Sequence, residues 1–377
     1  MKMKKLLWVL PAFAAVATLA SCGSAGSSKI SYVDEEGNKQ TVDVKPTEDS
    51  DAVVETLYAM TKQEVSKPKE VTVAAKVNAE VAATTADSKK VNYSANLDAK
   101  LQLAADLNAK TAEDLVNSLG AYAHIKLDAT APSLEILGSE TPDFTKTYKY
   151  ALDAEAFVEA TQMYAYFNKI DLPKVPVTEE TKEMASVINA AVPVLKASVL
   201  DFNFGSYLTD EVADQIDSVL PMLNDKICIY DIVKTQSDEF DDATFKAQLA
   251  AGVEAAGITI KAVSGSVVTF NFAVDPTSKP TDELKSYKVG QVAATKTLIS
   301  VDVAVDVQKV LPKSISVDLA SALTNTVQAP EGFTAFEFSK ASVSVNFSYN
   351  ESVKKIAASK TTDTVPVTDI INMFMGD

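Results

Sequence analysis

Side chains that could carry out nucleophilic, acid–base or metal chemistry are few in this sequence. It contains one histidine, His124, and two cysteines, Cys22 and Cys228. A serine or cysteine nucleophile is normally activated by a neighbouring histidine, so any such site would depend on His124. That residue lies between Ala123 and Ile125, at a polar position of an alternating segment, where a solvent-facing side chain is the simpler interpretation. We therefore predict no catalytic residue and no enzymatic activity.

Sites for metals, cofactors and nucleic acids are equally poorly supported. One histidine and one remaining cysteine cannot supply the ligands of a zinc site, and the acidic segment 238–242 lacks the spacing and the glycine of a calcium loop. The 35 cationic residues are all lysine, and the net charge is −16. Arginine is the preferred residue for phosphate recognition, so its absence argues against a nucleic-acid partner. We expect no metal and no cofactor, and a buried inert thiol at Cys228 in an apolar strand over 227–233.

The N-terminus has the features of an export signal. Three of the first five residues are lysine, and residues 6–20 carry no charge. This apolar run is too short to span a bilayer but is typical of a secretory signal. The following motif, Leu19-Ala20-Ser21-Cys22, resembles the bacterial lipobox. The resemblance implies that residues 1–21 are a lipoprotein signal peptide, and that Cys22 carries a covalent diacylglyceryl lipid as the first residue of the mature chain.

Residues 22–48 are predicted to be a lipidated tether followed by a polar N-terminal segment. Residues 23–28 are small and flexible, whereas 29–48 alternate weakly and form either a hairpin around 36–38 or a linker. Several acyl chains make a stable anchor. We thus expect the protein at the extracytoplasmic face of the cell membrane or outer membrane, with the membrane as a partner through the lipid.

The remaining residues, 49–377, are predicted to form an α+β domain. Apolar and polar residues alternate over 71–81, 91–103 and 121–127, which favours long antiparallel strands with one apolar and one polar face. Similar alternation returns in the last third of the chain, at 258–274, 299–319 and 336–349. These runs predict a large sheet, and a long sheet should curve strongly because strand twist accumulates.

Helices are expected at three places. Ser50 or Asp51 can cap a helix that continues to about residue 64, and Asp241 can cap another that ends at Gly257. Residues 178–222 indicate a mainly helical insertion, capped by Thr178 and interrupted by a proline. Such amphipathic helices could cover the apolar face of the sheet.

This order of elements resembles the LolA-type and LppX-type lipoprotein carriers. The most similar local segment is 305–317, an aspartate-containing strand, a Leu-Pro bend and a returning strand. The resemblance implies a half-barrel, in which one strongly curved antiparallel sheet has helices covering its concave apolar face. It further implies that acyl chains are held between the sheet and the helices.

Aromatic residues in the middle of the chain are the candidate ligand-binding residues: Tyr148, Tyr150, Tyr164, Tyr166 and Phe167. They could line a pocket for a hydrophobic small molecule or lipid, or they could pack within the core or on the sheet. The first hypothesis is therefore a lipid-anchored carrier of a hydrophobic ligand. The alternative is a structural or adhesive surface lipoprotein that binds another macromolecule and has no ligand cavity. The sequence leaves the oligomeric state open.

Overall fold

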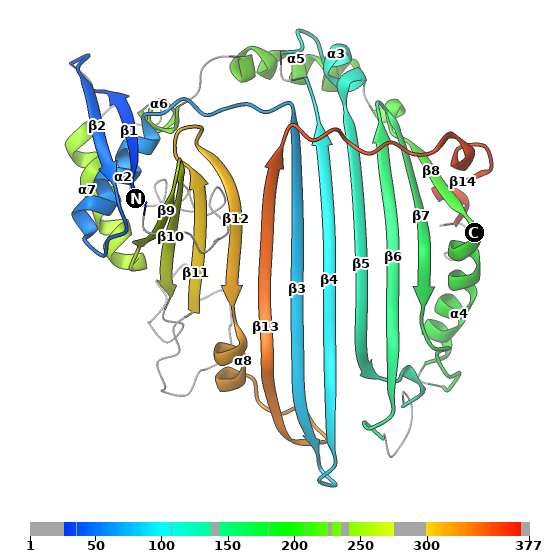
Figure 1. Cartoon of the computed structure of the whole chain (residues 1–377). Coiled ribbons are helices and arrows are strands. Elements are labelled where there is room, and N and C mark those ends of the chain that lie inside the picture. The colour runs from blue at the N-terminus through cyan, green and yellow to red at the C-terminus, as the bar shows by residue number, and fades with distance from the viewer. Residues whose placement is uncertain are drawn as a thin grey trace. The chain divides into compact units, whose positions relative to one another are not determined.

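The chain folds as an α+β protein dominated by a large antiparallel sheet with several helices (Figure 1). This confirms the coarse part of the predicted fold class, an α+β protein with a large antiparallel sheet. The structure, a computed structural model, describes residues 26–34, 36–106, 108–136, 143–179, 181–207, 209–224, 228–234, 241–274 and 299–370. The predicted signal peptide and Cys22 lie outside these residues.

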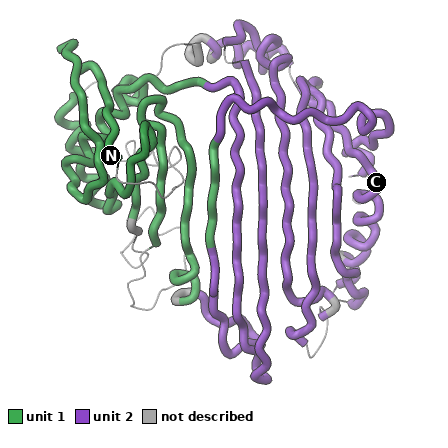
Figure 2. The backbone as a smooth tube through the Cα atoms, viewed as in Figure 1, with its two compact units in different colours: residues 1–67, 225–326, 342–347 green, residues 68–224, 327–341, 348–377 purple. Residues whose placement is uncertain are grey.

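Two compact units are each assembled from separate parts of the sequence (Figure 2). Unit 1 comprises residues 1–67, 225–326 and 342–347, and unit 2 comprises residues 68–224, 327–341 and 348–377. Strand β13 (Phe333–Tyr349) contributes residues to both.

Unit 1 combines a hairpin, an antiparallel set of strands and several helices. Its elements are β1 (Ser28–Val33), β2 (Lys39–Val44), α2 (Ser50–Thr61), α6 (Ile229–Lys234), α7 (Asp242–Ala256), β9 (Thr259–Ser264), β10 (Val267–Val274), β11 (Ile299–Asp306), β12 (Leu311–Asp318) and α8 (Ala320–Thr326). Strands β1 and β2 pair antiparallel, and Gly37 in their turn has φ +84°. The hairpin interpretation of 36–38 is thus confirmed.

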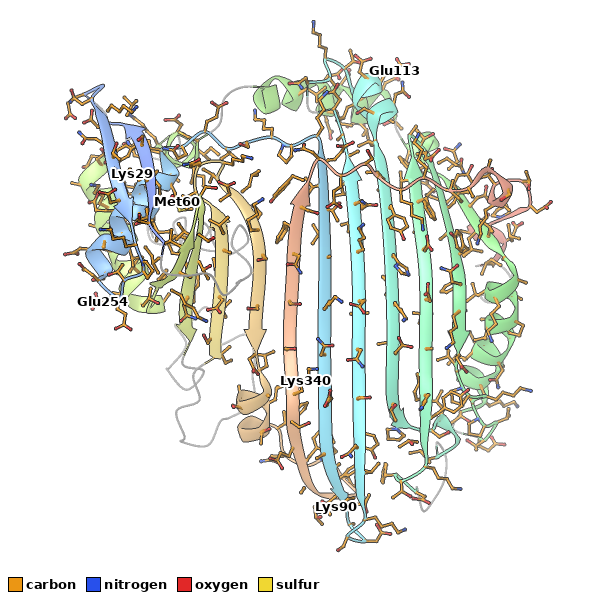
Figure 3. The ribbon with its side chains drawn as sticks, viewed as in Figure 1. Lys29, Met60, Lys90, Glu113, Glu254 and Lys340 are labelled. Atoms are coloured by element: carbon orange, nitrogen blue, oxygen red, sulfur yellow. The ribbon has the colours of Figure 1, made fainter. Side chains whose placement is uncertain are left out.

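The core of unit 1 forms where α2 and α7 pack on β9–β11. Val263, Val268 and Val303 on the inner side of these strands are at most 2% exposed. Asp241 accepts a hydrogen bond from the Thr244 amide at 2.7 Å, and Gly257 ends α7 in the left-handed conformation, as predicted. Figure 3 shows Met60 within this unit, and the buried fraction of its side chain places it in the core. This arrangement of helices on a sheet buries a continuous apolar layer.

A group of hydrogen bonds fastens α2 to α7 inside unit 1. The Asp242 carboxylate accepts from the Tyr58 hydroxyl at 2.5 Å, from the Tyr230 hydroxyl, and from Lys62 Nζ at 3.2 Å. Lys62 Nζ also lies 3.0 Å from the centroid of the Tyr230 ring. Burial acts to raise the pKa of Asp242, but the hydrogen bonds from Tyr230, Tyr58 and Lys62 outweigh it, and the pKa lies below its ordinary value. We call these four residues the Asp242 cluster.

Two local predictions for this unit are wrong. Of the apolar run predicted as a strand over 227–233, residues 229–233 lie in helix α6 instead, because a run this short fits either structure and tertiary packing decides. Helix α2 is capped by Asp49, which accepts from the Asp51 amide, and not by Ser50 or Asp51. Any of these polar residues can cap, so the sequence did not distinguish them.

Unit 2 is built on long antiparallel strands. Its elements are β3 (Glu70–Thr85), β4 (Lys90–Ala104), α3 (Ala112–Ser118), β5 (Gly120–Pro132), β6 (Thr147–Glu159), β7 (Gln162–Asp171), α4 (Lys182–Ala197), β8 (Val199–Asn203), α5 (Asp210–Asn224) and β14 (Thr364–Pro366), with 3-10 turns at Leu134–Ile136, Gly205–Tyr207 and Ala358–Lys360. The strand order is β14-β8-β7-β6-β5-β4-β3, and only β14 and β8 pair in parallel. The long strands expected from the alternation are confirmed.

The helical insertion expected over 178–222 is interrupted by a strand. Helix α4 continues through Pro193, β8 follows directly and pairs with β7, and α5 completes the segment. The prediction of one mainly helical insertion is therefore only partly right. Thr178 does not cap α4. Its hydroxyl instead bonds to Thr181, the residue that precedes the helix.

Candidate ligand-binding face

One face of β3–β7 in unit 2 carries no charged side chain over most of its area. The strand registers place the following residues on this side: Val71, Val73, Ala75, Val77, Ala79, Leu97, Ala99, Leu101, Leu103, Ala121, Ala123, Ile125, Leu127, Leu152, Ala154, Ala156, Val158, Met163, Ala165 and Phe167. We call this set the apolar face. It arises directly from the period-two alternation, because neighbouring residues of a strand point to opposite sides.

Part of the apolar face is open to solvent. Leu101, Leu103 and Ile125 are 39%, 45% and 43% exposed. In Figure 1, α3 and α5 lie beyond the ends of the strands and α4 lies along the β7 side, where it contacts β7. The expected helical cover therefore does not extend over these three side chains.

The apolar face is as large as the largest apolar patches that typical monomers expose. With strands about 4.8 Å apart and about 3.3 Å per residue, roughly eight residues on each strand of β3–β7 give a patch of about 24 by 26 Å, or about 600 Å². The largest apolar patch on a typical monomer covers about 300–600 Å² and is often functional. The apolar face is thus at the upper limit of what proteins leave uncovered without a partner.

Small and large residues alternate in rows across the apolar face. Ala123, Ala156 and Ala165 are direct cross-strand partners on β5, β6 and β7. The next row along the strands contains Ile125 and Phe167 on either side of Ala154. The surface therefore has a shallow relief of methyl groups beside larger side chains, and it can pack against another apolar surface.

The opposite face of β5–β7 is covered by the C-terminal segment, residues 350–366. Tyr122, Phe157 and Tyr166 form a buried cluster on this side, and Val353 and Ile356 pack against it. Figure 1 shows this segment crossing the strands of unit 2 on its way from β13 to β14. At this end of the strands, the face opposite the apolar face is therefore covered by protein, although the alternation predicts that it is polar.

Lys354 ties the C-terminal segment to the sheet. Its Nζ donates to Glu155 Oε2 at 2.5 Å and to the Tyr122 hydroxyl at 3.3 Å, and its backbone amide donates to Gln102 Oε1 at 3.2 Å. Burial acts to raise the pKa of Glu155, but hydrogen bonds from Lys354 and Asn168 outweigh it, so that the pKa is lowered. The hydrogen bond to Glu155 raises the pKa of Lys354. Both groups are therefore held in their charged forms.

The aromatic residues proposed for ligand binding do not form one pocket. Register places Tyr148, Tyr150 and Phe167 on the side of the apolar face, whereas Tyr164 and Tyr166 lie on the opposite side. The hydroxyls of Tyr148 and Tyr150 donate to Asp171 Oδ1 at 2.7 Å and to the Pro132 carbonyl at 2.6 Å. The five residues are close in sequence, but alternation separates them.

His124 and Cys228, the residues considered for chemistry, each form a hydrogen bond to an aspartate. His124 Nε2 lies 3.1 Å from Asp153 Oδ1 on the polar side of the sheet. The Cys228 thiol donates to Asp231 Oδ2 at 2.7 Å, and burial raises the pKa of this thiol. A raised pKa keeps the thiol protonated and lowers its reactivity. Within the described ranges, no three histidine, cysteine or acidic side chains are grouped so as to hold a metal ion.

A cleft that the sequence did not indicate lies at the β3–β4 turn of unit 2. Its volume is about 740 Å³, and its lining includes Asp87, Lys89, Asp143, Phe144 and Gly332. Gly332 has φ +90°, and a Cβ there would lie 2.5 Å from Phe144 Cε2. Gly332 and Phe144 are far apart in the sequence, so no local pattern predicts that they lie close together. The only sequence signal for this contact is the glycine itself.

Comparison with known proteins gives a short result. No family model and no curated protein matches this chain. None of the helices in the described ranges is both long and apolar enough to cross a bilayer. Arguments about function therefore depend on the residues themselves.

Proposed function

We propose that this protein is a membrane-anchored extracytoplasmic lipoprotein, and that its apolar face binds a hydrophobic ligand such as a lipid. The observation that carries the proposal is the uncharged face of β3–β7, on which Leu101, Leu103 and Ile125 are exposed. Exposed apolar area of this size marks interaction sites, because leaving it in water costs free energy.

The anchor is proposed from the sequence alone. The lipobox-like residues that end in Cys22 follow a signal-like apolar run, and acyl chains on this cysteine would hold the mature chain at a membrane. Replacing Cys22 with Ala should release the protein from the membrane fraction. Continued association with membranes would mean that another feature anchors the protein.

Unit 1 is a poor place for the ligand, although it has helices on a sheet as a half-barrel carrier does. Its inner side chains fill the space between these layers, as the near-complete burial of Val263, Phe270 and Val303 indicates. Filled cores leave no room for a guest molecule. The LolA-like and LppX-like half-barrel with a strongly curved sheet is retained as a proposal for the architecture only, without its helix-covered ligand site, and the ligand is assigned to the apolar face of unit 2.

A second candidate is a structural or adhesive surface lipoprotein. Its support is the openness of the apolar face, since a broad exposed surface suits a macromolecule better than a small ligand. Neither candidate is an enzyme; this stays a prediction from the sequence, in which activation of a nucleophile would depend on the single histidine, His124.

Ligand binding can be tested with a chain of residues 26–377, which begins where the described structure begins and lacks the anchor. We expect native mass spectrometry to find co-purified lipid, and a fluorescent fatty-acid analogue to bind. Leu101→Asp should abolish binding, because it places a charge on the apolar face. Asn92→Asp is the matched control, since Asn92 is exposed on the opposite side of the same strand. A lipid-free parent chain that takes up no analogue would reject the ligand proposal.

A further inference from the structure

We infer that a second copy of this chain covers the apolar face, so that two copies stack through β3–β7. The inference rests on the proposed function in assigning binding to this face. Sites for small ligands usually bury about 70–90% of the ligand surface. A ligand lying on an open sheet touches protein on one side only, so the site is incomplete without a cover.

The area of the apolar face suits a weak dimer. Stacking two faces of about 600 Å² each buries about 1,200 Å², which is the lower limit of stable interfaces. Burial of this size predicts a dimer that depends on concentration, which the membrane anchor would favour by confining both copies to one surface.

Charge also favours self-association through this face over any other. The chain has a net charge of −16, so contact between two copies generally brings carboxylates together. The polar side of the same strands carries Lys76, Asp98 and Asp128, whereas the apolar face has no charged residue among its members. Stacking through the apolar face therefore desolvates no ion.

The relief of the apolar face is compatible with two-fold symmetry. Facing sheets pack about 10 Å apart with their strands rotated by about 30°. In a two-fold interface each copy presents the same surface, so the alanine row of one copy (Ala123, Ala156 and Ala165) can receive the larger Ile125 and Phe167 of the other. Side chains of the two inner faces then interdigitate in a dimer without ligand, as they do in a sandwich core, whereas a bound lipid would lie between the two faces in place of these contacts.

Cross-linking of the full-length lipidated chain in membranes tests this inference. In a Cys228→Ser background, Ile125→Cys reports on the apolar face, and Asn92→Cys on the opposite side. A bifunctional maleimide should give a covalent dimer from Ile125→Cys and not from Asn92→Cys. Adding Leu101→Asp should reduce the dimer about tenfold or more, as expected within an interface. Hydrogen exchange of residues 350–366 checks that the variant still folds, and Leu103→Gln replaces it if it does not.

Other outcomes separate this inference from the proposed function. Equal cross-linking from both positions, or none from either, would overturn the second copy as the cover. Cross-linking of Ile125→Cys to a protein of different mass would overturn it in favour of another partner. Lipid extracted from a chain that does not dimerise would leave the proposed ligand intact. A dimer that contains no lipid would support the inference and reject the ligand.

Discussion

Removing the Asp242 carboxylate should loosen the contact between α2 and α7 in unit 1. Lys62 is only 7% exposed in its side chain, and Asp242 is its ion-pair partner. Asp242→Ala would leave this ammonium group largely buried without a counter-charge, and would remove the acceptor of the Tyr58 and Tyr230 hydroxyls. Breaking a buried pair on one side typically costs about 3–5 kcal/mol. We expect about 3 kcal/mol here, because Asp242 itself is 31% exposed and the tyrosine rings still face the ammonium.

Hydrogen exchange followed by mass spectrometry can measure this loss locally. A loss of about 3 kcal/mol corresponds to an approximately hundredfold faster exchange of the protected amides in α2 (Ser50–Thr61) and α7 (Asp242–Ala256). Asp43→Ala is the control, since the Asp43–Lys29 pair is 3.6 Å apart and more than half exposed on both sides. Exposed pairs contribute little, so this variant should exchange like the parent.

The pH dependence provides a second measurement on the same carboxylate. The pKa of Asp242 in the folded chain is lowered from 3.8, so its contribution to stability is complete above that value and is lost as the pH falls through the folded pKa. Protection of α2 should therefore fall on acidification in the parent, and less so in Asp242→Ala. Exchange rates in α2 and α7 within threefold of the parent would refute the reasoning. Lys62→Met combined with Asp242→Leu should restore most of the protection, because an apolar pair needs no counter-charge.

Two further predictions concern unit 2. Glu155→Gln should speed hydrogen exchange in residues 350–366, because Lys354 loses its carboxylate partner; unchanged exchange would show that apolar packing alone holds the segment. Gly332→Ala should lower the melting temperature of the chain markedly, because its φ is +90° and its Cβ would lie 2.5 Å from Phe144. Gly265→Ala is the control, with φ +59° and open space around the Cβ, and should cost only about 1 kcal/mol. Equal melting temperatures for the two variants would rule out the clash with Phe144.

Alternation alone was sufficient to predict β3, β4 and β5 and the residues that they contribute to the apolar face, but it did not indicate β8 or β14. Leu97, Leu101 and Leu103 lie on the same side of β4, as the period requires. Alternation also separates Tyr166 from Phe167, so the predicted aromatic pocket could have been questioned from sequence alone. Pairing across strands, by contrast, is set by distant residues, and no local pattern shows which rows face each other.

What covers each face could not be predicted. Residues 350–360 are polar and have no clear period, so nothing in them indicates that Val353 and Ile356 cover Tyr122 and Phe157. A pattern shows which side of a strand is apolar, but cover depends on where other segments go. The short run of α6 was likewise ambiguous, since six apolar-rich residues satisfy both a buried strand and a helix.

The C-terminal segment has a consequence for how the protein is made. Lys354 and Tyr122 are separated by 232 residues, and the aromatic cluster around Tyr122 is completed only when both are present. At about 5–20 residues per second, ribosomes would need roughly 10–50 s to synthesise the residues between them. During that interval the early strands would expose both their part of the apolar face and an incomplete aromatic cluster around Tyr122. Such nascent chains are prone to aggregate. A stop codon directly after residue 350 would leave every long strand intact but would remove Val353, Lys354 and Ile356, so that the aromatic cluster would stay uncovered.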